Sequence, residues 1–452
     1  MQRTLISDSL KHIDEDIVIQ GWVQTRRDHG KLVFLDVRDL TGLIQVVVNP
    51  QESKVAHDEA QKLRAEFVVQ IAGHVRKRPK NLVNPGLLTG MLEIEVTDLM
   101  ILAAAETLPF ESDSPLNIDT YLDFQPIALR GPKNRAVFKI QSAIAQTFRE
   151  FLQSRNFTEF QAPKIVAQAA EGGANIFQVK YFGHQAFLAQ SPQLYKQIMV
   201  GIFERVFTIT SVYRAEPHST TRHLNEYVSL DLEFGFIRDH TDIMDLERDW
   251  MEYLMTYLDH HYHAELALLG VTLPKIPKQI PTFKLREVQG ILKKQHGIDA
   301  IGEPDLEPEH EKLICQYATE KLDSEFVFVT HYPTSKRPFY TYPDEKNPEE
   351  TKSFDLLFRG VEVTTGGQRI HDYKQLLTNI DKWGYKRENF SFYLQAFKYG
   401  MPPEGGCATG LERLTQKICG LPNIKLATLF PRDLNRIDIS ISKLKLDEKK
   451  EK

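Results

Sequence analysis

The stretch VFTITSVYRAEPHSTTRHLNEYVSLDLEFGFI, residues 206–237, decides the fold that we expect for this chain. It predicts two strands, 206–216 and 227–237, joined by a polar loop. Successive side chains of a strand point to opposite faces, so Arg214 and Glu216 share a face. On the second strand the polar face carries Tyr227, Ser229, Asp231 and Glu233, and the apolar face carries Val228, Leu230, Leu232 and Phe234.

A polar sheet face of this kind is most often just a solvent-facing surface. Here, however, the connecting loop adds His218, Arg222 and His223 next to the same face. Such a concentration of groups that bind anions favours a site over a plain surface.

The strands and helices expected around this hairpin do not alternate regularly, as they would in a series of βαβ units. Further strands are expected at 324–332 and 355–363, and helices over much of 240–320, 373–396 and 410–419. This pattern predicts an α+β domain with an antiparallel sheet flanked by helices. The chain has neither a GxxxxGK[ST] loop nor a GxGxxG fingerprint, so a nucleotide-binding enzyme of this kind would be neither a P-loop nor a Rossmann protein.

Two further segments carry groups suited to a polyphosphate and a divalent cation. In SFDLLFRGVEVTTGGQRIHD (353–372), Asp355 and Glu362 are expected on a strand pair or a strand and turn, within reach of a common hard cation. In GGCATGLER (405–413), glycines precede a helix that begins near Gly410 and places Arg413 in its first turn. A helix N-terminus with an arginine suits a terminal phosphate.

Residues 1–103 are expected to be all-β. Five short strand-like runs, at 17–23, 31–39, 43–49, 66–75 and 91–102, surround a polar helix near 51–64. This order suits an OB-type Greek-key barrel, with a sandwich fragment as the alternative. Residues 104–131 are expected to be a linker, 132–440 the α+β domain, and 441–452 a charged tail.

Composition narrows the class of protein. The 452 residues carry 56 Lys+Arg against 61 Asp+Glu, which argues against indiscriminate coating of nucleic acid. No stretch of 18 apolar residues predicts a membrane span, and the first residues do not resemble a signal peptide. The three cysteines, Cys315, Cys407 and Cys419, form no disulfide or zinc spacing, so we expect a cytoplasmic protein.

From about residue 15 to 437 the sequence resembles class II aminoacyl-tRNA synthetases of subclass IIb, and among them the shorter archaeal/eukaryotic-like aspartyl group. Residues 136–165, with Pro163, resemble motif 1; 206–237 resemble motif 2; and 405–419 resemble motif 3. The segments QSPQLYKQ (190–197), RPFYTYP (337–343) and FDLLFRGVEVTTGGQRIHD (354–372) carry the resemblance to the aspartyl group. One departure is Ala408, where archaeal relatives usually have glycine and the bacterial form also has alanine.

The resemblance implies an enzyme that joins L-aspartate to tRNA-Asp with ATP and Mg²⁺ and that forms a homodimer through motif 1. Arg214 and Arg413 would be catalytic: Arg214 on the α-phosphate and Arg413 on the γ-phosphate. The remaining ATP-binding residues would be Glu216, Arg222, His223, Tyr227 and Glu362, and the metal ligands would be Asp355 and Glu362.

The same resemblance implies that Lys196 and Arg369 grip the side-chain carboxylate of aspartate, whereas Glu171, Gln193 and Asp231 receive its α-ammonium group. The N-terminal barrel would read the anticodon through Arg27, His29, Phe34, Gln45 and Glu93. An aromatic residue on the polar face of an OB strand, as Phe34 is, suits stacking of an unpaired base. In the loop RRDHG, His29 indicates that tRNA-Asn is a possible second substrate.

Two alternatives stand beside this prediction. One is an asparaginyl or lysyl enzyme of the same subclass. The other is a synthetase-like protein that charges no tRNA, such as an ATP-dependent amide-forming enzyme or a regulatory module. The anticodon-like barrel argues against the amide-forming enzyme, and the full set Arg214, Asp355, Glu362 and Arg413 argues against an inactive module.

Overall fold

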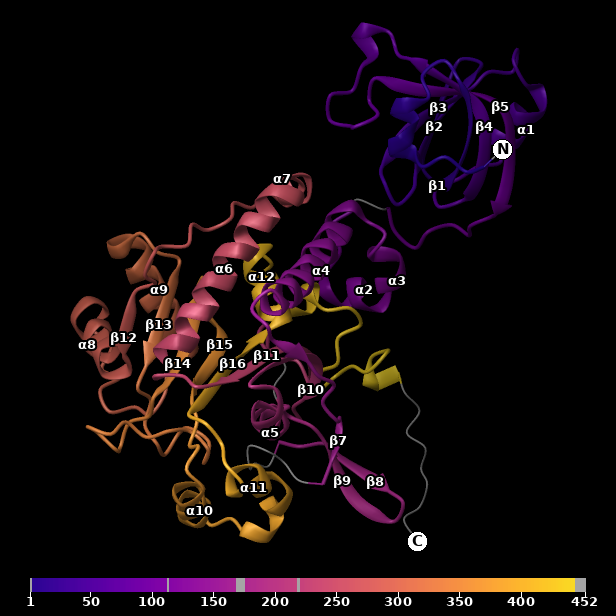
Figure 1. The fold of residues 1–452 in the computed structure, drawn as a ribbon. Coiled ribbons are helices and arrows are strands. Elements are labelled where there is room, and N and C mark those ends of the chain that lie inside the picture. The colour runs from indigo at the N-terminus through magenta and orange to yellow at the C-terminus, as the bar shows by residue number, and fades with distance from the viewer. Residues whose placement is uncertain (1, 112–113, 168–174, 218–219, 444–452) are drawn as a thin grey trace. The chain divides into compact units, whose positions relative to one another are not determined.

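The computed structural model describes residues 2–111, 114–167, 175–217 and 220–443. The chain divides into two compact units, Met1–Pro115 and Leu116–Lys452 (Figure 1). Among the helices described, none is both long enough and apolar enough to cross a lipid bilayer.

The first unit is a closed five-stranded barrel with the strand order β1-β2-β3-β5-β4. Its elements are η1 (Ile6–Lys11), β1 (Asp16–His29), β2 (Leu32–Arg38), β3 (Leu43–Val48), α1 (Lys54–Ala60), β4 (Val68–Lys77), η2 (Lys80–Leu82) and β5 (Leu92–Ala103). Apolar side chains alternate inward along each strand and form one core, which includes Ile19, Leu35 and Val46. The prediction of an OB-type barrel is confirmed.

Strand β1 is longer than the sequence predicted, because it continues from Val23 to His29 alongside β2. The pairing register shifts between Val23 and Thr25, as at a β-bulge. Beyond this shift Arg27 pairs with Phe34, so this arginine lies next to the aromatic ring that is predicted to stack on a base.

The second unit is built on an eight-stranded sheet with the order β12-β13-β14-β15-β16-β11-β10-β6. Its strands are β6 (Thr158–Glu159), β10 (Arg205–Tyr213), β11 (Glu226–Gly235), β12 (Thr282–Lys284), β13 (Phe326–Thr330), β14 (Ser353–Phe358), β15 (Val361–Gln368) and β16 (Glu404–Gly410). Most neighbours are antiparallel; β6 with β10 and β12 with β13 are parallel. The prediction of an antiparallel sheet in an α+β domain is confirmed.

Helices cover both faces of this sheet. They are α2 (Ile118–Asp123), α3 (Gln125–Ala128), α4 (Pro132–Gln153), α5 (Gln193–Phe203), α6 (Thr241–His261), α7 (His263–Leu269), α8 (Leu285–His296), α9 (Pro308–Leu322), α10 (Tyr373–Lys382), α11 (Ser391–Lys398) and α12 (Leu411–Ile418). Short 3-10 turns are η3 (Arg387–Phe390), η4 (Ile424–Ala427) and η5 (Ile441–Lys443). A small sheet, β7 (Ile165–Val166), β8 (Gln178–Tyr181) and β9 (His184–Leu188), stands apart with the order β7-β9-β8.

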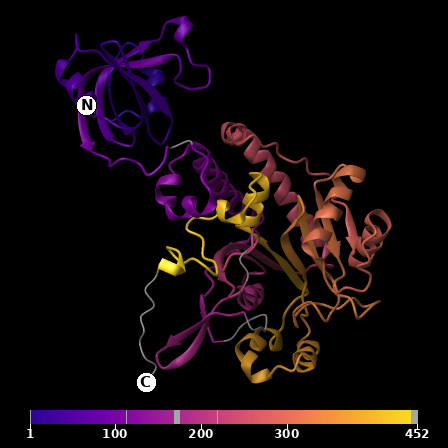
Figure 2. The same ribbon diagram turned by 180° about the vertical axis from the view of Figure 1, so that it is seen from behind.

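One face of the large sheet is closed by α4, α6 and α12, whose apolar side chains share one core with those of the strands. Both ribbon views show α4 and α6 lying together across this face (Figure 2). Phe148 of α4 and Trp250 of α6 meet edge to face with ring centroids 4.9 Å apart. Leu230 and Leu232 of β11 contribute to this core, as the alternation in the sequence indicated.

Two local predictions need correction. The segment 405–410, expected as glycines before a helix, is the central strand β16, paired with β11 and β15. Close strand approach explains its composition, because a Cβ on Gly406 would lie 2.1 Å from the carbonyl oxygen of Leu232. The segment 355–363, given above as one strand range although Asp355 and Glu362 were expected on a strand pair or a strand and turn, is a hairpin, since Arg359 (φ 48°) and Gly360 (φ 78°) turn the chain between β14 and β15.

Candidate functional site

A cavity of about 650 Å³ lies on the sheet face opposite α4 and α6, within the second unit. Helix α5, the segment 336–341 and the strands β11, β15 and β16 all contribute to its walls. Ten of the residues predicted from the sequence line it: Gln193, Lys196, Arg214, Glu216, Arg222, His223, Tyr227, Glu362, Arg369 and Arg413. Asp231 and Asp355 lie behind this lining as ion-pair partners of residues in it, and Glu171 falls outside the described residues.

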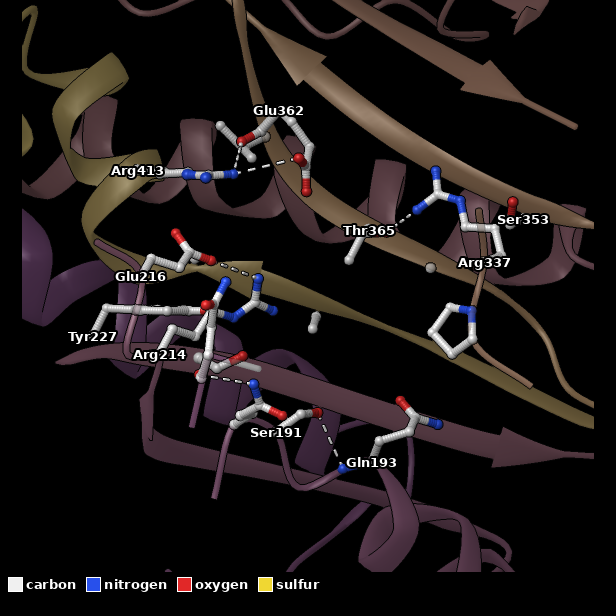
Figure 3. Close-up of a pocket in the computed structure, with 18 of the residues that line it drawn as sticks. Ser191, Gln193, Arg214, Glu216, Tyr227, Arg337, Ser353, Glu362, Thr365 and Arg413 are labelled. Atoms are coloured by element: carbon white, nitrogen blue, oxygen red, sulfur yellow. Dashed lines mark hydrogen bonds and ion pairs between the residues drawn. The ribbon is translucent and has the colours of Figure 1, made fainter. Parts of the chain in front are cut away.

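One end of the cavity combines an arginine, a carboxylate and an aromatic ring. Just beyond the end of β10, the backbone N–H of Arg214 donates to the carbonyl oxygen of Asn225, so the strand-like course continues and keeps Arg214 and Glu216 on the same side. Their charged groups are 3.8 Å apart, and the guanidinium lies 5.8 Å from the ring centroid of Tyr227 (Figure 3). A planar cation, a hydrogen-bond acceptor and a flat ring are the groups needed to hold a phosphate next to a purine.

Two more arginines face the same cavity. Arg413, in the first turn of α12, donates from Nη1 to the backbone oxygen of Glu362 and lies 3.5 Å from its carboxylate (Figure 3). Arg222, from the loop between β10 and β11, donates to Glu311 of α9 at 2.5 Å. With Arg214 they are three of the five arginines that line the cavity, an arrangement that suits an anion with several charges.

Asp355 and Glu362 lie on the neighbouring strands β14 and β15, and together they could hold a magnesium ion. One carboxylate oxygen of Asp355 accepts from Arg337 at 2.7 Å, and the other is buried and has no hydrogen-bond partner among the described residues. Burial raises the pKa of Glu362, an effect that Arg413 opposes. A spare buried acceptor beside a second carboxylate fits a hard cation.

No group of three or more His, Cys, Asp or Glu residues that could hold a metal occurs in the described part of the chain. Magnesium is usually held by one or two carboxylates together with substrate phosphates and water. Asp355 and Glu362 therefore suit an ion that arrives with a nucleotide, rather than one held by the protein alone.

The other end of the cavity holds a buried network of charges around Glu233. The ammonium group of Lys196 lies 3.0 Å from Asp231 and 3.0 Å from Glu233, and Arg369 donates from Nε to Glu233 at 2.7 Å. Burial alone would raise the pKa of Glu233, but Arg369 and Lys196 hold it below its usual value. The two predicted cations therefore converge on one small region, joined by one carboxylate.

Arg369 keeps donor capacity for a ligand in this network. Its Nη2 group donates to the carbonyl oxygen of Gly406 at 2.9 Å and approaches Gln193 at 3.5 Å. Its Nη1 group makes no hydrogen bond within the described residues and belongs to a side chain that lines the cavity. A small carboxylate at this end would complete the hydrogen bonding of the guanidinium group.

The prediction from sequence missed several members of the site. Glu233 is two residues after Asp231 in the same strand, so the alternation already indicated that it lies on the same polar face of the sheet. Arg337 belongs to a segment singled out from the sequence, but nothing there indicated that it would donate to Asp355 and to Thr365. Glu404 gave no signal: it is fully buried, accepts from Gln197 at 2.7 Å, and burial raises its pKa well above its usual value.

The barrel of the first unit brings the predicted base-reading residues onto neighbouring strands. Phe34 of β2 pairs with Arg27 of β1, and Gln45 of β3 pairs with Glu93 of β5. The amide of Gln45 donates to Glu93 at 3.0 Å. His29 is exposed at the end of β1.

Arg78, just beyond β4, was not predicted as part of this surface. It donates to the side-chain oxygen of Gln45 at 3.1 Å and lies 3.7 Å from Glu93. The outer face of the barrel thus offers an aromatic ring next to linked donors and acceptors, as in single-strand nucleic-acid binding.

Comparison with known families agrees with both units. Residues 117–434 match the family described as tRNA synthetases class II (D, K and N). Residues 17–102 match the OB-fold nucleic acid binding domain.

The chain is 44% identical to the Aspartate--tRNA(Asp/Asn) ligase of Deinococcus radiodurans, over 97% of this chain and 99% of that protein. It is also 44% identical to the Aspartate--tRNA(Asp/Asn) ligase of Thermus thermophilus, over 96% and 99%. Among solved structures, it is similar to asparaginyl-tRNA synthetase from Pyrococcus horikoshii complexed with asparaginyl-adenylate. That structure has a TM-score of 0.89 and 29% identity, over 97% of this chain and 99% of the other.

Proposed function

This chain belongs to the class II aminoacyl-tRNA synthetases of the D, K and N group, and from that membership we propose that it is an aspartate–tRNA ligase. It activates L-aspartate with ATP and transfers the aspartyl group to the 3′ end of tRNA. The observation that carries this choice of amino acid is the convergence of Lys196 and Arg369 on Glu233 at one end of the cavity.

The buried charges explain why aspartate is chosen over asparagine. Asp231 receives the α-ammonium group, and Arg369, supported by Lys196, receives the side-chain carboxylate. Asparagine has nearly the same shape but carries no charge on its side chain, so its amide would give the Nη1 group of Arg369, which Glu233 does not use, no charged acceptor. Loss of a charged partner in a buried site is costly, which makes the preference for the acid strong.

The first reaction needs placement of two anions rather than a protein nucleophile. The α-carboxylate oxygen of aspartate attacks the α-phosphorus of ATP, the bond to the β-phosphate oxygen breaks, and pyrophosphate leaves. Arg214 binds the α-phosphate and stabilises the charge that develops there. Arg222, His223 and Arg413 hold the outer phosphates, while Glu216 and Tyr227 hold the adenine.

We propose that Asp355 and Glu362 hold Mg²⁺, which would neutralise phosphate charge as a Lewis acid when it is bound. In the second reaction a terminal ribose hydroxyl of tRNA attacks the carbonyl carbon of the adenylate, and AMP leaves with the bonding electrons. Arg214 remains next to the leaving phosphate in this step.

The barrel is proposed to read the anticodon. Phe34 offers a stacking surface, Gln45 and Glu93 offer hydrogen-bonding groups for base edges, and Arg27 offers a cation for phosphate or base. His29 lies near them on β1. We propose that the enzyme charges both tRNA-Asp and tRNA-Asn, since the two relatives at 44% identity are named for both.

Aminoacylation with labelled aspartate tests both parts. Purified tRNA-Asp and tRNA-Asn transcripts are compared, with a third transcript of unrelated anticodon as control. Product on tRNA-Asp supports the proposed ligase, and its absence rejects it. Product on tRNA-Asn supports the broader specificity, whereas a level equal to that of the control removes that part alone.

We also propose a homodimer joined through 136–165. Its two-residue strand β6 ends the large sheet, and its outer edge is unpaired among the described residues. An unpaired edge next to a long helix can be covered by a second copy. Sedimentation equilibrium distinguishes a mass of about 104 kDa from the 52.0 kDa of one chain, and a mass of one chain at micromolar concentration contradicts the dimer.

A further inference from the structure

Glu311 lies outside all three motif segments but contacts one of them, 206–237, and strand β15. It is in the first turn of α9, and one of its carboxylate oxygens, Oε2, is the acceptor of two hydrogen bonds. Arg222 donates to it from Nη2 at 2.5 Å, and the backbone N–H of Glu362 donates to it at 2.9 Å. A single oxygen thus joins the loop between β10 and β11 to the start of β15.

Packing alone does not explain a carboxylate at this position. Helix α9 docks through apolar residues, including Ile314, Cys315 and Ala318, which form a core with β13. The Glu311 side chain is only 10% exposed, and a buried carboxylate is costly unless it has charged or hydrogen-bonded partners. Its two partners are the arginine of the cavity wall and the strand that carries the proposed metal ligand.

The geometry leaves Arg222 able to bind a further anion. A guanidinium group has five donors in a fixed plane, and the bond to Glu311 uses only its Nη2 group. The side chain of Arg222 also lines the cavity, as does that of Arg413. Glu311 therefore holds the plane of the guanidinium group without using all of its donors.

We propose that Glu311 is a positioning residue that orients Arg222 toward the terminal phosphate of ATP and fixes it relative to Glu362. This inference rests on the proposed function only in taking ATP as the ligand. Without Glu311, Arg222 would have to be ordered by the nucleotide itself, which lowers affinity by the cost of immobilising a long side chain.

The opposite effect is physically possible and makes the proposal testable. A carboxylate close to phosphate groups repels them, so a Glu311 that acted only through its own charge would weaken ATP binding. Removal of such a residue would strengthen binding. Orientation of Arg222 and direct repulsion thus predict changes of opposite sign.

The test is a double-mutant cycle of Glu311→Ala and Arg222→Ala, read first by calorimetric titration with ATP and Mg²⁺ in the absence of amino acid. We expect Glu311→Ala to weaken ATP binding by up to about tenfold, because the nucleotide must then order the long side chain of Arg222 itself. The double variant should bind no more weakly than Arg222→Ala alone, since Glu311 acts through Arg222. Glu311→Gln keeps an acceptor oxygen and should recover part of the affinity.

Glu309→Ala is the matched control, because Glu309 is exposed in the same turn of α9 and should leave ATP affinity unchanged. Thermal unfolding of each variant detects general loss of structure. In pyrophosphate exchange, Glu311→Ala should raise KM for ATP and leave KM for aspartate within about twofold. Unchanged or stronger ATP binding in Glu311→Ala, or fully additive losses in the double variant, would overturn the proposal.

These readouts separate the two proposals. If the wild-type chain binds ATP but aspartate supports no exchange, the proposed function fails while the binding cycle still tests Glu311. If exchange with aspartate is normal and the cycle shows no coupling, the role of Glu311 fails alone.

Discussion

Replacement of Arg369 by leucine tests the carboxylate clamp most sharply among single substitutions. Arg369 is the cation with an unused donor group, and its contacts, with Glu233, Gly406 and Gln193, all lie at the amino-acid end of the cavity. Loss of one partner from a buried ion pair costs about 3–5 kcal/mol, which corresponds to a fall in kcat/KM for aspartate of roughly 150- to 5,000-fold. ATP affinity should stay within about twofold, because Arg369 touches none of the proposed nucleotide groups.

The variant also disturbs the folded protein, because it leaves Glu233 with Lys196 as its remaining cation. A second variant, Arg369→Leu with Glu233→Gln, removes one charge of each sign and keeps an acceptor for Lys196. We expect it to recover thermal stability relative to Arg369→Leu without recovering use of aspartate. Pyrophosphate exchange at varied aspartate measures both variants. Activation of aspartate within threefold of wild type by the folded double variant would refute the clamp.

Three further predictions concern the barrel, the core and the metal. Phe34→Ala should lower kcat/KM for tRNA charging about 5- to 150-fold through lost stacking, and leave pyrophosphate exchange unchanged; equal loss in both assays would contradict an anticodon role. Burial raises the pKa of Glu247 to about 8 from 4.5, so the folded state holds a proton that the unfolded chain releases, and stability falls as the pH rises between these values. Glu247→Gln should therefore raise Tm at pH 8 and change it little at pH 4; an equal effect at both would contradict this. Asp355→Asn should raise the Mg²⁺ concentration needed for half-maximal exchange, and an unchanged magnesium dependence would count against its role as a ligand.

The sequence predicted those parts of the fold in which local pattern and burial agree. In β11 the apolar side chains on one face, including Leu230 and Leu232, point into the core. Apolar and polar side chains alternate in the same way along the strands of the barrel. The prediction failed at β16, because small residues give no strand signal. The small residues of β16 are required by a close contact between strands, because Gly406 lies against Leu232 of β11, 174 residues earlier in the chain.

The candidate site was likewise predictable from the sequence only in part. The alternation in β11 predicted that Asp231 and Glu233 lie on the same face of the sheet. It could not predict that both are buried, because their burial depends on α5, which covers this polar face with Lys196. The meeting of distant segments in one cavity was expected from family resemblance rather than from local pattern. Glu311 and Glu404 could not have been found, since a single acid in a helix or strand has the same local appearance whether it is exposed or paired in the interior.

The most direct test of the whole account is amino-acid-dependent exchange of pyrophosphate into ATP by the wild-type chain, without tRNA. Aspartate and asparagine are compared at equal concentrations. The buried cations Lys196 and Arg369, with the unused Nη1 group of Arg369 at the cavity, predict rapid exchange with aspartate and, for asparagine, a rate at least about a hundredfold lower. Comparable exchange with the amide would show that this end of the cavity does not select for charge.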